Sequence, residues 1–451
     1  MIKEPVVIVG GGVAGLSAGA SLAQSGHRVL VLDARPQLGG RATAFTDRET
    51  GELVDNGQHV LFGFYRATFE FLSRIGAAEN VRVQPSLAVP YVDRSGRRTV
   101  LRCPPLPSPL HLLAGVLDWD AMPWRDRLPA GKLARPLTQA RRELERTGSI
   151  TVDPPVTVSE WLTTHGQRPK LRNWLWEPLA VAALNQAPGV ASATPFVRVL
   201  AEMFGPDPSA AALVLPTRPL HQMYAEPARQ FIEARGGEIR LNALARVSVE
   251  HGRVRAVDVR GERIATSIVL STVPWFELDK LFAGGVPASL APLVARANAM
   301  ESMPIVTVNL WYDRPVMNEA FVGLPGRDMQ WIFDKRFVFG GETSHLSTIS
   351  SGAVRLAGLP NEKLIALADC EVRESLPPAH DAKLTRATVI RERQATFSLA
   401  PGQPARPGVR TAVGGLYLAG DWIDTGLPGT IESAVVSGHV AADEIRGVAA
   451  Q

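Results

Sequence analysis

The sequence predicts an α/β protein with a Rossmann-like nucleotide-binding domain. Three features predict this fold class. A strand, a glycine-rich turn and a helix open the chain, a strand ending in Gly-Asp precedes a helix near its end, and a β hairpin lies between them. The 451 residues suffice for two or three folding units, and the 45% share of hydrophobic residues excludes a disordered chain.

Composition and charge exclude several classes of protein. The net charge is only +4 and the sequence has no block of Lys and Arg, so nucleic acid is not an expected partner. Cys103 and Cys370 belong to no CxxC motif or Cys/His cluster, which predicts no metal site and a reducing, cytoplasmic compartment or at most one long-range disulfide. Residues 5–26 carry no charge, but Pro5 and six glycines favour a nucleotide-binding fold over a membrane span, and no other segment suits a span.

The N-terminal segment is typical of a strand, a helix and a second strand. Residues 5–9 are a β-branched run suited to a strand that is buried on both faces. Residues 16–26 keep the apolar spacing of a helix that ends at a glycine, and residues 28–32 form the second strand. This order predicts a βαβ unit.

The turn of this unit carries the chemistry of a dinucleotide site. In the pattern G-x-G-x-x-G, Gly10 makes the tight turn, Gly12 lets backbone amides approach a pyrophosphate, and Gly15 lets helix and strand pack closely. Asp33 ends the second strand, where an acidic side chain accepts hydrogen bonds from ribose hydroxyls. The agreement of turn, strands, helix and acid predicts a bound dinucleotide.

Two further segments have the composition of cofactor contacts. Gly39 and Gly40 permit close backbone approach after the second strand, and Arg41 offers a guanidinium for phosphate charge. Near the other end, residues 416–421 are typical of a short strand ending in Gly-Asp, and residues 429–438 of a helix N-terminus rich in small residues.

Together these segments resemble the flavin amine oxidase and phytoene desaturase superfamily, whose GR2-type domain binds FAD. The resemblance implies FAD as the cofactor. No second GxGxxG unit that would bind NAD(P)H follows, so an external electron donor is expected. The implied cofactor-binding residues are Gly10, Gly12, Val13, Ala14, Gly15, Asp33, Ala34, Arg35, Gly40, Arg41, Ala42, Gly57, Gln58, His59, Val247, Gly420, Asp421, Thr430 and Ile431.

The middle of the chain determines the expected domain boundaries. Residues 239–250 and 253–259 read as a hairpin around His251-Gly252, followed by a strand within 265–273. In the resembling superfamily this block rejoins the FAD domain, so the resemblance implies a discontinuous, Rossmann-like FAD-binding domain with an α+β substrate domain. The expected FAD domain therefore comprises residues 1–90, 225–275 and 405–451. The expected substrate domain comprises the mostly helical residues 91–224 and residues 276–404, with strands at 305–312, 327–333 and 346–350.

Two longer strings indicate a branch of the superfamily. Residues 55–66 (DNGQHVLFGFYR) and 174–185 (WLWEPLAVAALN) resemble the squalene-associated FAD-dependent desaturases, that is, the hydroxysqualene dehydroxylases. This resemblance implies reductive dehydroxylation of hydroxysqualene to squalene in hopanoid or related triterpene biosynthesis. It leaves open whether upstream squalene-pathway synthases bind the protein.

The implied reaction requires a proton donor and a site that stabilises a cation. His59 is the first candidate for the acid, although it is equally suited to contacting FAD or to satisfying buried hydrogen bonds. Glu177 is the second, with pairing to Arg172 the favoured alternative. Aromatic faces stabilise cations, and each candidate is equally interpretable as a core residue. The substrate candidates are Trp275, Trp311, Tyr312, Trp331 and Phe333.

An isoprenoid lipid substrate is insoluble in water, so entry from a membrane is expected. Residues 103–117 are uncharged and lead into Trp119 and Trp124 and then into basic residues, an order typical of an interfacial element. Residues 103–135 are therefore a candidate for peripheral docking on the inner face of the cytoplasmic membrane. The alternative is a helix that covers the substrate cavity with a solvated basic face.

Other functions are compatible with the same fold. The nearest is a phytoene or carotenoid-type FAD-dependent desaturase or isomerase, in which electrons flow in the opposite direction. An amine oxidase is disfavoured, since Cys370 is poorly placed for a covalent flavin link and no aromatic cage is identifiable. A non-enzymatic prenyl-lipid binder is disfavoured by the intact glycine motifs.

Overall fold

The parallel sheet predicted from the N-terminal sequence is present in a computed structural model, which describes residues 4–107 and 109–449. Its five strands come from three separate stretches of the chain, and all neighbours pair in parallel. In spatial order they are β10 (Glu238–Arg240), β2 (Val29–Leu32), β1 (Val6–Val9), β14 (Val269–Ser271) and β20 (Leu416–Leu418).

Both faces of this sheet are covered, which explains its uninterrupted apolar strands. Because side chains alternate along a strand, Val6 and Ile8 pack with the helices on one face, whereas Val7 and Val9 pack on the other. The helices are α1 (Val13–Gln24), α2 (Arg66–Arg74), α10 (Glu226–Glu233) and α14 (Ile431–Ala449). The opposite face carries an antiparallel sheet of β11 (Ala245–Glu250), β12 (Arg253–Val259) and β13 (Glu262–Ala265), with α11 (Ala291–Asn298) beside it.

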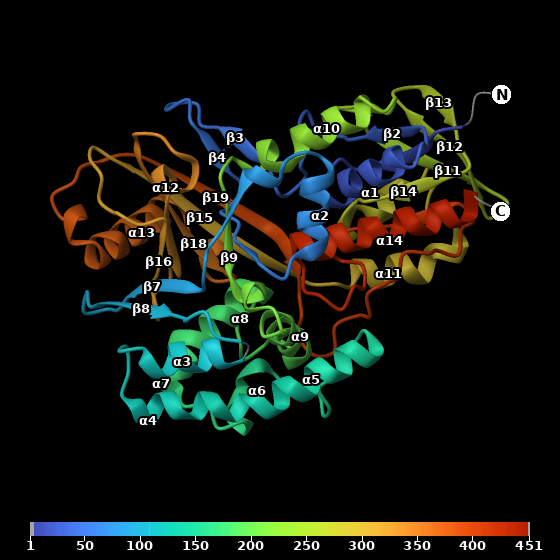
Figure 1. Cartoon of the computed structure of the whole chain (residues 1–451). Helices are drawn as coiled ribbons and strands as arrows, with labels where there is room; N and C mark the ends of the chain where they lie inside the picture. Colours follow the sequence, from blue (N-terminus) through green and yellow to red (C-terminus); the bar gives the residue numbers. More distant parts are fainter. Residues whose placement is uncertain (1–3, 108, 450–451) are drawn as a thin grey trace.

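A seven-stranded mixed sheet forms the second body, next to the first (Figure 1). Helix α13 (Asn361–Ser375) packs on one of its faces. In spatial order the strands are β19 (Leu384–Phe397), β15 (Ser302–Tyr312), β18 (Ser344–Ser351), β17 (Trp331–Asp334), β16 (Phe321–Gly323), β7 (Ala88–Val92) and β8 (Arg98–Arg102).

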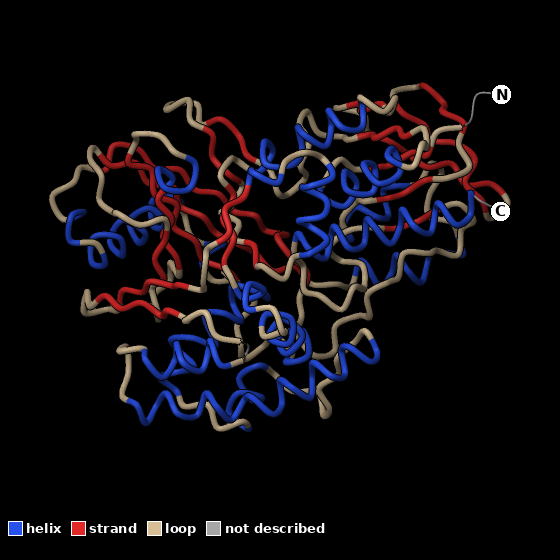
Figure 2. Tube along the Cα trace, viewed as in Figure 1, coloured by secondary structure: helices blue, strands red, loops and turns tan. Residues whose placement is uncertain are grey.

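A layer of helices lies below the two bodies in the view of Figure 1, and Figure 2 shows how sharply it is separated from the strands. Its helices are α3 (Leu110–Asp118), α4 (Trp124–Arg127), α5 (Ala134–Thr147), α6 (Val158–Thr164), α7 (Pro169–Leu171), α8 (Glu177–Leu184) and α9 (Ala193–Met203). The remaining elements are α12 (Lys335–Phe339), the pair β3 (Ala44–Thr46) and β4 (Leu53–Asp55), and the small sheet of β5 (Leu61–Phe62), β9 (Leu213–Pro216) and β6 (Val81–Val83).

The predicted fold class is confirmed, and the elements differ mainly in their limits. The hairpin turns at His251 and Gly252, which both have positive φ angles. The strand expected within 265–273 divides into the end of β13 and β14, which belong to different sheets. The strand expected at 327–333 is only β17, because Asp328 and Met329 instead donate their amides to the buried carboxylate of Glu371.

The packing refines the domain boundaries that we propose. Leu290, Val294 and Met300 pack in the same core as the parallel sheet, although residues 276–404 were expected in the substrate domain. We therefore propose that the middle segment of the cofactor domain extends to about residue 300, and that the segment from β7 onward belongs to the substrate domain.

The contact between β1 and α1 gives a first testable prediction. A Cβ atom at Gly15 would lie 2.1 Å from the carbonyl oxygen of Gly10 and 2.9 Å from Oγ1 of Thr272. The backbone at Gly10 cannot move away without a cost in energy. Gly15→Ala should therefore reduce the free energy of unfolding by about 1–3 kcal/mol, measured by urea denaturation with tryptophan fluorescence. Gly447→Ala is the matched control, because a Cβ there meets no atom within 4 Å. An unchanged midpoint for Gly15→Ala would contradict this account.

Candidate cofactor and substrate site

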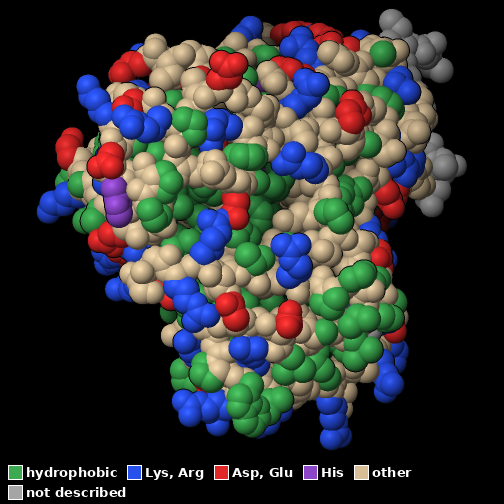
Figure 3. Space-filling model, turned by 60° about the vertical axis from the view of Figure 1, so that its left-hand side comes forward, with side chains coloured by type: hydrophobic (Ala, Val, Ile, Leu, Met, Phe, Trp, Pro, Cys, Tyr) green, Lys and Arg blue, Asp and Glu red, His purple; other side chains and the backbone are tan. Residues whose placement is uncertain are grey.

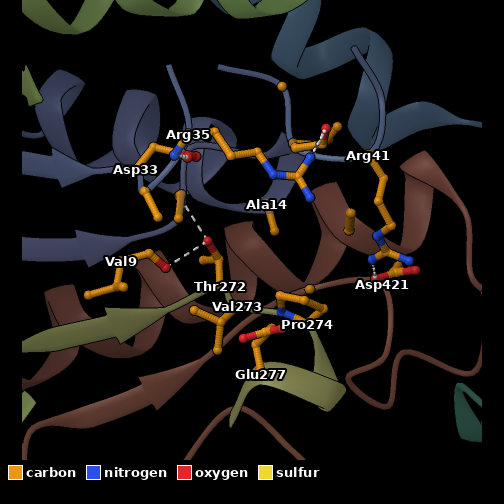
Figure 4. A pocket seen from close by; sticks show the side chains of 18 of the residues that line it. Val9, Ala14, Asp33, Arg35, Arg41, Thr272, Val273, Pro274, Glu277 and Asp421 are labelled. Carbon is orange, nitrogen blue, oxygen red and sulfur yellow. Dashed lines mark hydrogen bonds and ion pairs between the residues drawn. The ribbon is translucent and has the colours of Figure 1, made fainter. Parts of the chain in front are cut away.

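A cavity of about 410 Å³ opens at the carboxyl ends of the parallel strands, where ligands bind in folds of this type. It lies between segments from both ends and the middle of the chain (Figure 4). The sequence-predicted cofactor residues that line it are Gly10, Gly12, Val13, Ala14, Asp33, Ala34, Arg35, Gly40, Arg41, Ala42, His59, Gly420, Asp421, Thr430 and Ile431.

The first turn of α1 presents unpaired backbone donors to this cavity. Gly12 caps the helix without a side-chain hydrogen bond, and no acidic side chain occupies the first turn. Gly12 also forms a bridge to Gly39, so the two glycine segments lie side by side. A helix N-terminus with free amides favours an anionic group such as a pyrophosphate.

Asp33 lies at the end of β2, as predicted, and its carboxylate is fixed by two backbone donors. Its Oδ2 accepts from the Gly11 amide at 2.6 Å, and its Oδ1 accepts from the Arg35 amide at 2.8 Å. Each carboxylate oxygen has a second lone pair, so the group still has acceptors for ribose hydroxyls.

Arg41 and Asp421 join the two ends of the chain across the cavity. Nη2 of Arg41 lies 2.5 Å from Oδ1 of Asp421, and Nη1 donates to the carbonyl of Ala395 at 2.7 Å. The guanidinium also lies over the ring of Trp275, 5.4 Å from its centroid. This network holds a positive charge beside the glycine segment, and Figure 4 shows the ion pair at the edge of the cavity.

The N-terminus of α14 forms the opposite wall. Gly420 has a φ angle of +146° and donates its amide to Oγ of Ser437 at 2.8 Å. Thr430 and Ile431 stand at the first turn of α14, where backbone amides lack helical acceptors. The wall is therefore suited to a polar, electron-rich edge of a planar ring.

His59 faces the cavity as a neutral imidazole. Its Nδ1 lies 3.0 Å from the carbonyl of Gly57, which fixes the donor on Nδ1 and leaves Nε2 as an acceptor. Burial lowers the pKa of His59 below its usual value, and the charge of Lys335 adds to this effect, against the opposing charge of Asp55. A neutral imidazole at pH 7 has no acidic ring proton to give beyond the one already donated to Gly57, so we do not carry His59 forward as the acid.

Four of the predicted cofactor residues lie beside the cavity rather than on its wall. Gly15 is a packing residue between α1 and β1, and Gly57 has a φ angle of +95° that turns the chain toward His59. Val247 is fully buried, and its carbonyl accepts from the amide of Ala283 at 3.0 Å, while its neighbours Ala245 and Arg246 line the cavity. Gln58 lines a second cavity.

This second cavity, of about 150 Å³, is enclosed almost entirely by apolar side chains. It lies between the seven-stranded sheet and the helical layer, with walls from β7, β16 and β17 on one side and from α3, α8 and α9 on the other. The residues that line it include Val60, Phe62, Leu87, Val89, Tyr91, Leu101, Leu112, Leu175, Trp176, Leu179, Met203, Phe204, Phe321, Trp331, Phe333 and Ile349.

The cofactor cavity and this apolar cavity meet at one peptide unit. His59 lines the first, Gln58 lines the second, and Nε2 of Gln58 donates to the carbonyl of His59 at 3.0 Å. A molecule in the apolar cavity therefore lies next to whatever occupies the other.

Two of the five aromatic substrate candidates, Trp331 and Phe333, line the apolar cavity. Trp275 is buried beside the cofactor cavity under Arg41. Trp311 and Tyr312 line neither the cofactor cavity nor the apolar cavity, and as successive residues of β15 they point to opposite faces of the sheet. Trp311 stacks on His345 and donates to Glu52, and Tyr312 donates to Asp369 on the far face, so neither enters the substrate site that we propose.

Glu177 is engaged in an ion pair away from both cavities. Its Oε1 accepts from Nε and Nη2 of Arg172 at 3.1 and 2.9 Å. This is the alternative that the sequence favoured, and we do not retain Glu177 as an acid.

Sequence reasoning missed two buried polar residues of the site. The hydroxyl of Tyr224 donates to the carbonyls of Gly39 and Ala42, both at 2.9 Å, and so braces the glycine segment before Arg41. Lys335 donates to Gln58 from α12, which is 277 positions away along the chain. Neither residue belongs to a local motif that would have indicated its position.

The donor set of the larger cavity fits the expected FAD. Free helix amides and Arg41 suit the pyrophosphate, and Asp33 suits a ribose. A Cβ at Gly12 would point at Gly40 with 3.9 Å to its Cα, so two glycines leave the backbone exposed where phosphates approach.

Comparisons with known proteins agree with this assignment. The model of the family described as flavin containing amine oxidoreductase matches residues 13–446. A hydroxysqualene dehydroxylase from Rhodopseudomonas palustris is 30% identical, with 98% of each chain covered, and a probable zeta-carotene desaturase from Synechococcus elongatus is 23% identical, with 97% of each covered. An oxidoreductase structure from Methanosarcina mazei superimposes with a TM-score of 0.73 at 16% identity, covering 97% of this chain and 99% of that one, and shows the same fold.

The Arg41 network gives a prediction for cofactor affinity. Arg41→Ala removes the guanidinium from the glycine segment and leaves Asp421 without its partner, so the dissociation constant for FAD should rise about 10- to 100-fold. It is measured on the apoprotein by flavin fluorescence quenching. Arg48→Ala, an exposed arginine of the next loop, is the control and should bind FAD as the unmodified protein does. Equal affinities for both variants would contradict the assignment.

Proposed function

The chain belongs to the flavin containing amine oxidoreductase family and is an FAD-dependent oxidoreductase, and we propose that it converts hydroxysqualene to squalene by reductive loss of an allylic hydroxyl. In this proposal the reaction serves hopanoid or related triterpene biosynthesis, and an external donor reduces the cofactor. The name of the relative from Rhodopseudomonas palustris and the site itself both support the proposal.

The observation that carries the proposal is the apolar cavity that meets the cofactor cavity at Gln58 and His59. The walls are almost entirely apolar, and a long hydrocarbon has no hydrogen-bonding groups. Burial of such a chain in this cavity is favourable by about 25 cal/mol per Å² of apolar surface. A volume of about 150 Å³ holds only part of a C30 chain, so the side chains at the α3 end must move apart as the substrate enters.

When bound and reduced, FAD supplies a hydride. The protein's own residues create the conditions for the other half of the reaction. Trp331 and Phe333 contribute aromatic side chains to the wall of the apolar cavity, which suits a developing allylic cation. The apolar walls exclude water, which would otherwise trap such a cation.

A carotenoid-type desaturase remains the second candidate function, because the relative from Synechococcus elongatus also aligns over nearly the whole chain. That reaction removes hydride from a hydrocarbon and needs no polar group at the junction. The polar side chain of Gln58 at the end of the apolar cavity is the observation that favours an oxygen-bearing substrate.

Anaerobic single turnover tests the proposed function. The purified holoprotein is reduced chemically, mixed with hydroxysqualene in detergent, and followed by flavin absorbance and by chromatography of the lipid. We expect one squalene for each flavin reoxidised. Bleaching of the oxidised protein by phytoene, with no reoxidation of the reduced protein by hydroxysqualene, would favour the desaturase. Reoxidation by hydroxysqualene without squalene would contradict the proposed reaction.

We further propose that the helical layer docks on an anionic membrane surface at the cytoplasmic side. Five exposed large hydrophobic residues lie within 106–128, with Leu110 at 53% and Trp124 at 69% exposure. Exposed basic residues flank them, and Figure 3 shows hydrophobic and basic side chains interspersed over the lower, helical part of one face. Trp119, which the sequence placed in the same element, is instead buried against Tyr91. None of the described helices is long and apolar enough to cross a membrane.

Helix α3 connects this surface to the apolar cavity. Leu110 and Leu117 are exposed on one side of the helix, whereas Leu112 lines the cavity on the other. One helix thus separates the proposed lipid surface from the proposed substrate site, which is the shortest route for a water-insoluble substrate.

Vesicle sedimentation tests the docking surface. The double variant Leu110→Glu/Trp124→Glu places charges on the exposed side of α3 and α4, and its binding to phosphatidylglycerol-containing vesicles should fall at least about tenfold. Val354→Glu is the control, because Val354 is 62% exposed but lies outside the helical layer. Unchanged sedimentation of the double variant would contradict the docking surface without bearing on the reaction.

A further inference from the structure

Lys335 is a buried ammonium group at the start of α12. Its side chain is only 7% exposed, whereas Lys132, Lys170, Lys280, Lys363 and Lys383, the other lysines that the structure describes, are exposed. The ammonium lies 4.6 Å from the ring centroid of Phe339. A buried lysine is costly unless it is paired, so its partners indicate its role.

The partners of Lys335 come from the loop that separates the two cavities. Its Nζ donates to Oε1 of Gln58 and lies 3.5 Å from Oδ2 of Asp55. That oxygen of Asp55 has no hydrogen-bond partner among the described residues, and the other accepts from the amide of Leu220 at 3.0 Å. The carboxylate balances the charge of the lysine at a distance that leaves the ammonium free to make a closer contact.

The position of Lys335 is adjacent to the end of the apolar cavity. Trp331 and Phe333 line that cavity, and Lys335 follows two positions later as the first residue of α12, without itself lining the cavity. Gln58, which accepts its hydrogen bond, also lines the cavity. The side-chain amide of Gln58 therefore links the ammonium to the wall of the cavity.

Loss of an allylic hydroxyl as water requires a proton at the oxygen, and the other candidate donors are poorly suited. His59 is held neutral, and Glu177 is paired with Arg172 outside the cavity. Tyr91 lines the cavity, but burial raises the pKa of its phenol and makes it a weaker acid. Lys335 is a buried cation that reaches the junction through its hydrogen bond to Gln58.

We propose that the ammonium of Lys335 protonates the departing hydroxyl of the substrate, and that Gln58 holds the ammonium until the substrate oxygen takes its place as acceptor. This inference rests on the proposed function. An N–H bond of Lys335 breaks and an O–H bond forms, and the C–O bond breaks with its electron pair leaving in water. FAD, when bound and reduced, would supply the hydride that the allylic cation needs, and the neutral amine regains a proton from solvent.

The surroundings of Lys335 adjust its acidity in the required direction. Burial lowers the pKa of Lys335 from its ordinary value, while the charge of Asp55 opposes that shift. The other ionisable groups that face it are His59 and His345, whose pKa values are lowered by burial and by the charge of Lys335, and Asp334, which pairs with Arg336 at 2.7 Å. A lysine with a lowered pKa is a more effective general acid near neutral pH.

Replacement of Lys335 tests this inference. In single turnover, Lys335→Met should slow flavin reoxidation by hydroxysqualene at least about 100-fold, the usual contribution of a general acid. Substrate affinity, measured by tryptophan fluorescence, should change less than about threefold. For the unmodified protein the rate should fall on the alkaline side as the ammonium loses its proton, and Lys335→Met should lose this pH dependence. Lys363→Met, an exposed lysine of α13, is the matched control.

A substrate that needs no proton separates chemistry from structure. The acetate ester of hydroxysqualene carries a better leaving group, so Lys335→Met should turn it over within about tenfold of the unmodified protein. If Lys335→Met lost FAD, the test would be the pH dependence of the unmodified protein. A rate that does not fall at alkaline pH would overturn the inference. Equal slowing for alcohol and ester, or an unslowed variant, would also overturn it. Failure of the unmodified protein to form squalene would instead overturn the proposed function.

Discussion

The loop from Asp55 to His59 is the constraint on which the site depends, because its His59 lines the cofactor cavity and its Gln58 lines the apolar cavity. Its residues are tied to both bodies of the molecule. Asn56 donates to the carbonyl of Arg41 and to Glu392 of β19, and Asp55 and Gln58 meet Lys335. A displacement of either body would therefore move the loop, and with it the distance between flavin and substrate. In the reaction that we propose, hydride transfer tolerates little such displacement, which would give these ties a catalytic reason.

Around this loop, burial shifts the pKa values of His59 and Lys335 more than ion pairing does. Low local polarity favours the neutral forms of His59 and Lys335 and so lowers both pKa values, yet the consequences differ. An imidazole that ordinarily titrates near pH 6.5 becomes neutral under working conditions, whereas an ammonium that starts near pH 10.5 becomes a stronger acid. The same physical cause thus removes one proton donor and creates another, which is why the acid cannot be chosen from residue type alone.

The parts of the site that the sequence predicted are those whose partners are close in the chain. The turn from Gly10 to Gly15 and the acid at Asp33 belong to one βαβ unit, so spacing alone places them. Lys335 lies 277 positions from Gln58, and their approach depends on how β17 ends against a loop of the other body. The substrate candidates show the same division. Alternation along β17 points Trp331 and Phe333 into the cavity. Trp311 and Tyr312 point to opposite faces of β15, and neither reaches the cavity, because the place of β15 in the sheet depends on pairing with distant strands.

The pair of Asp55 and Lys335 is difficult to explain by stability. Removing two charges from water costs several kcal/mol for each ion, and a separation of 3.5 Å without a direct hydrogen bond recovers that cost poorly. An apolar pair of similar volume would suit a wall of the hydrocarbon cavity better. Charged groups that are retained in such a place are typical of functional sites. A desaturase acting on a polyene has no oxygen to protonate and no use for this ammonium, whereas a dehydroxylase requires one proton at this end of the cavity. The buried charge is therefore the feature of this chain that best distinguishes the two reactions.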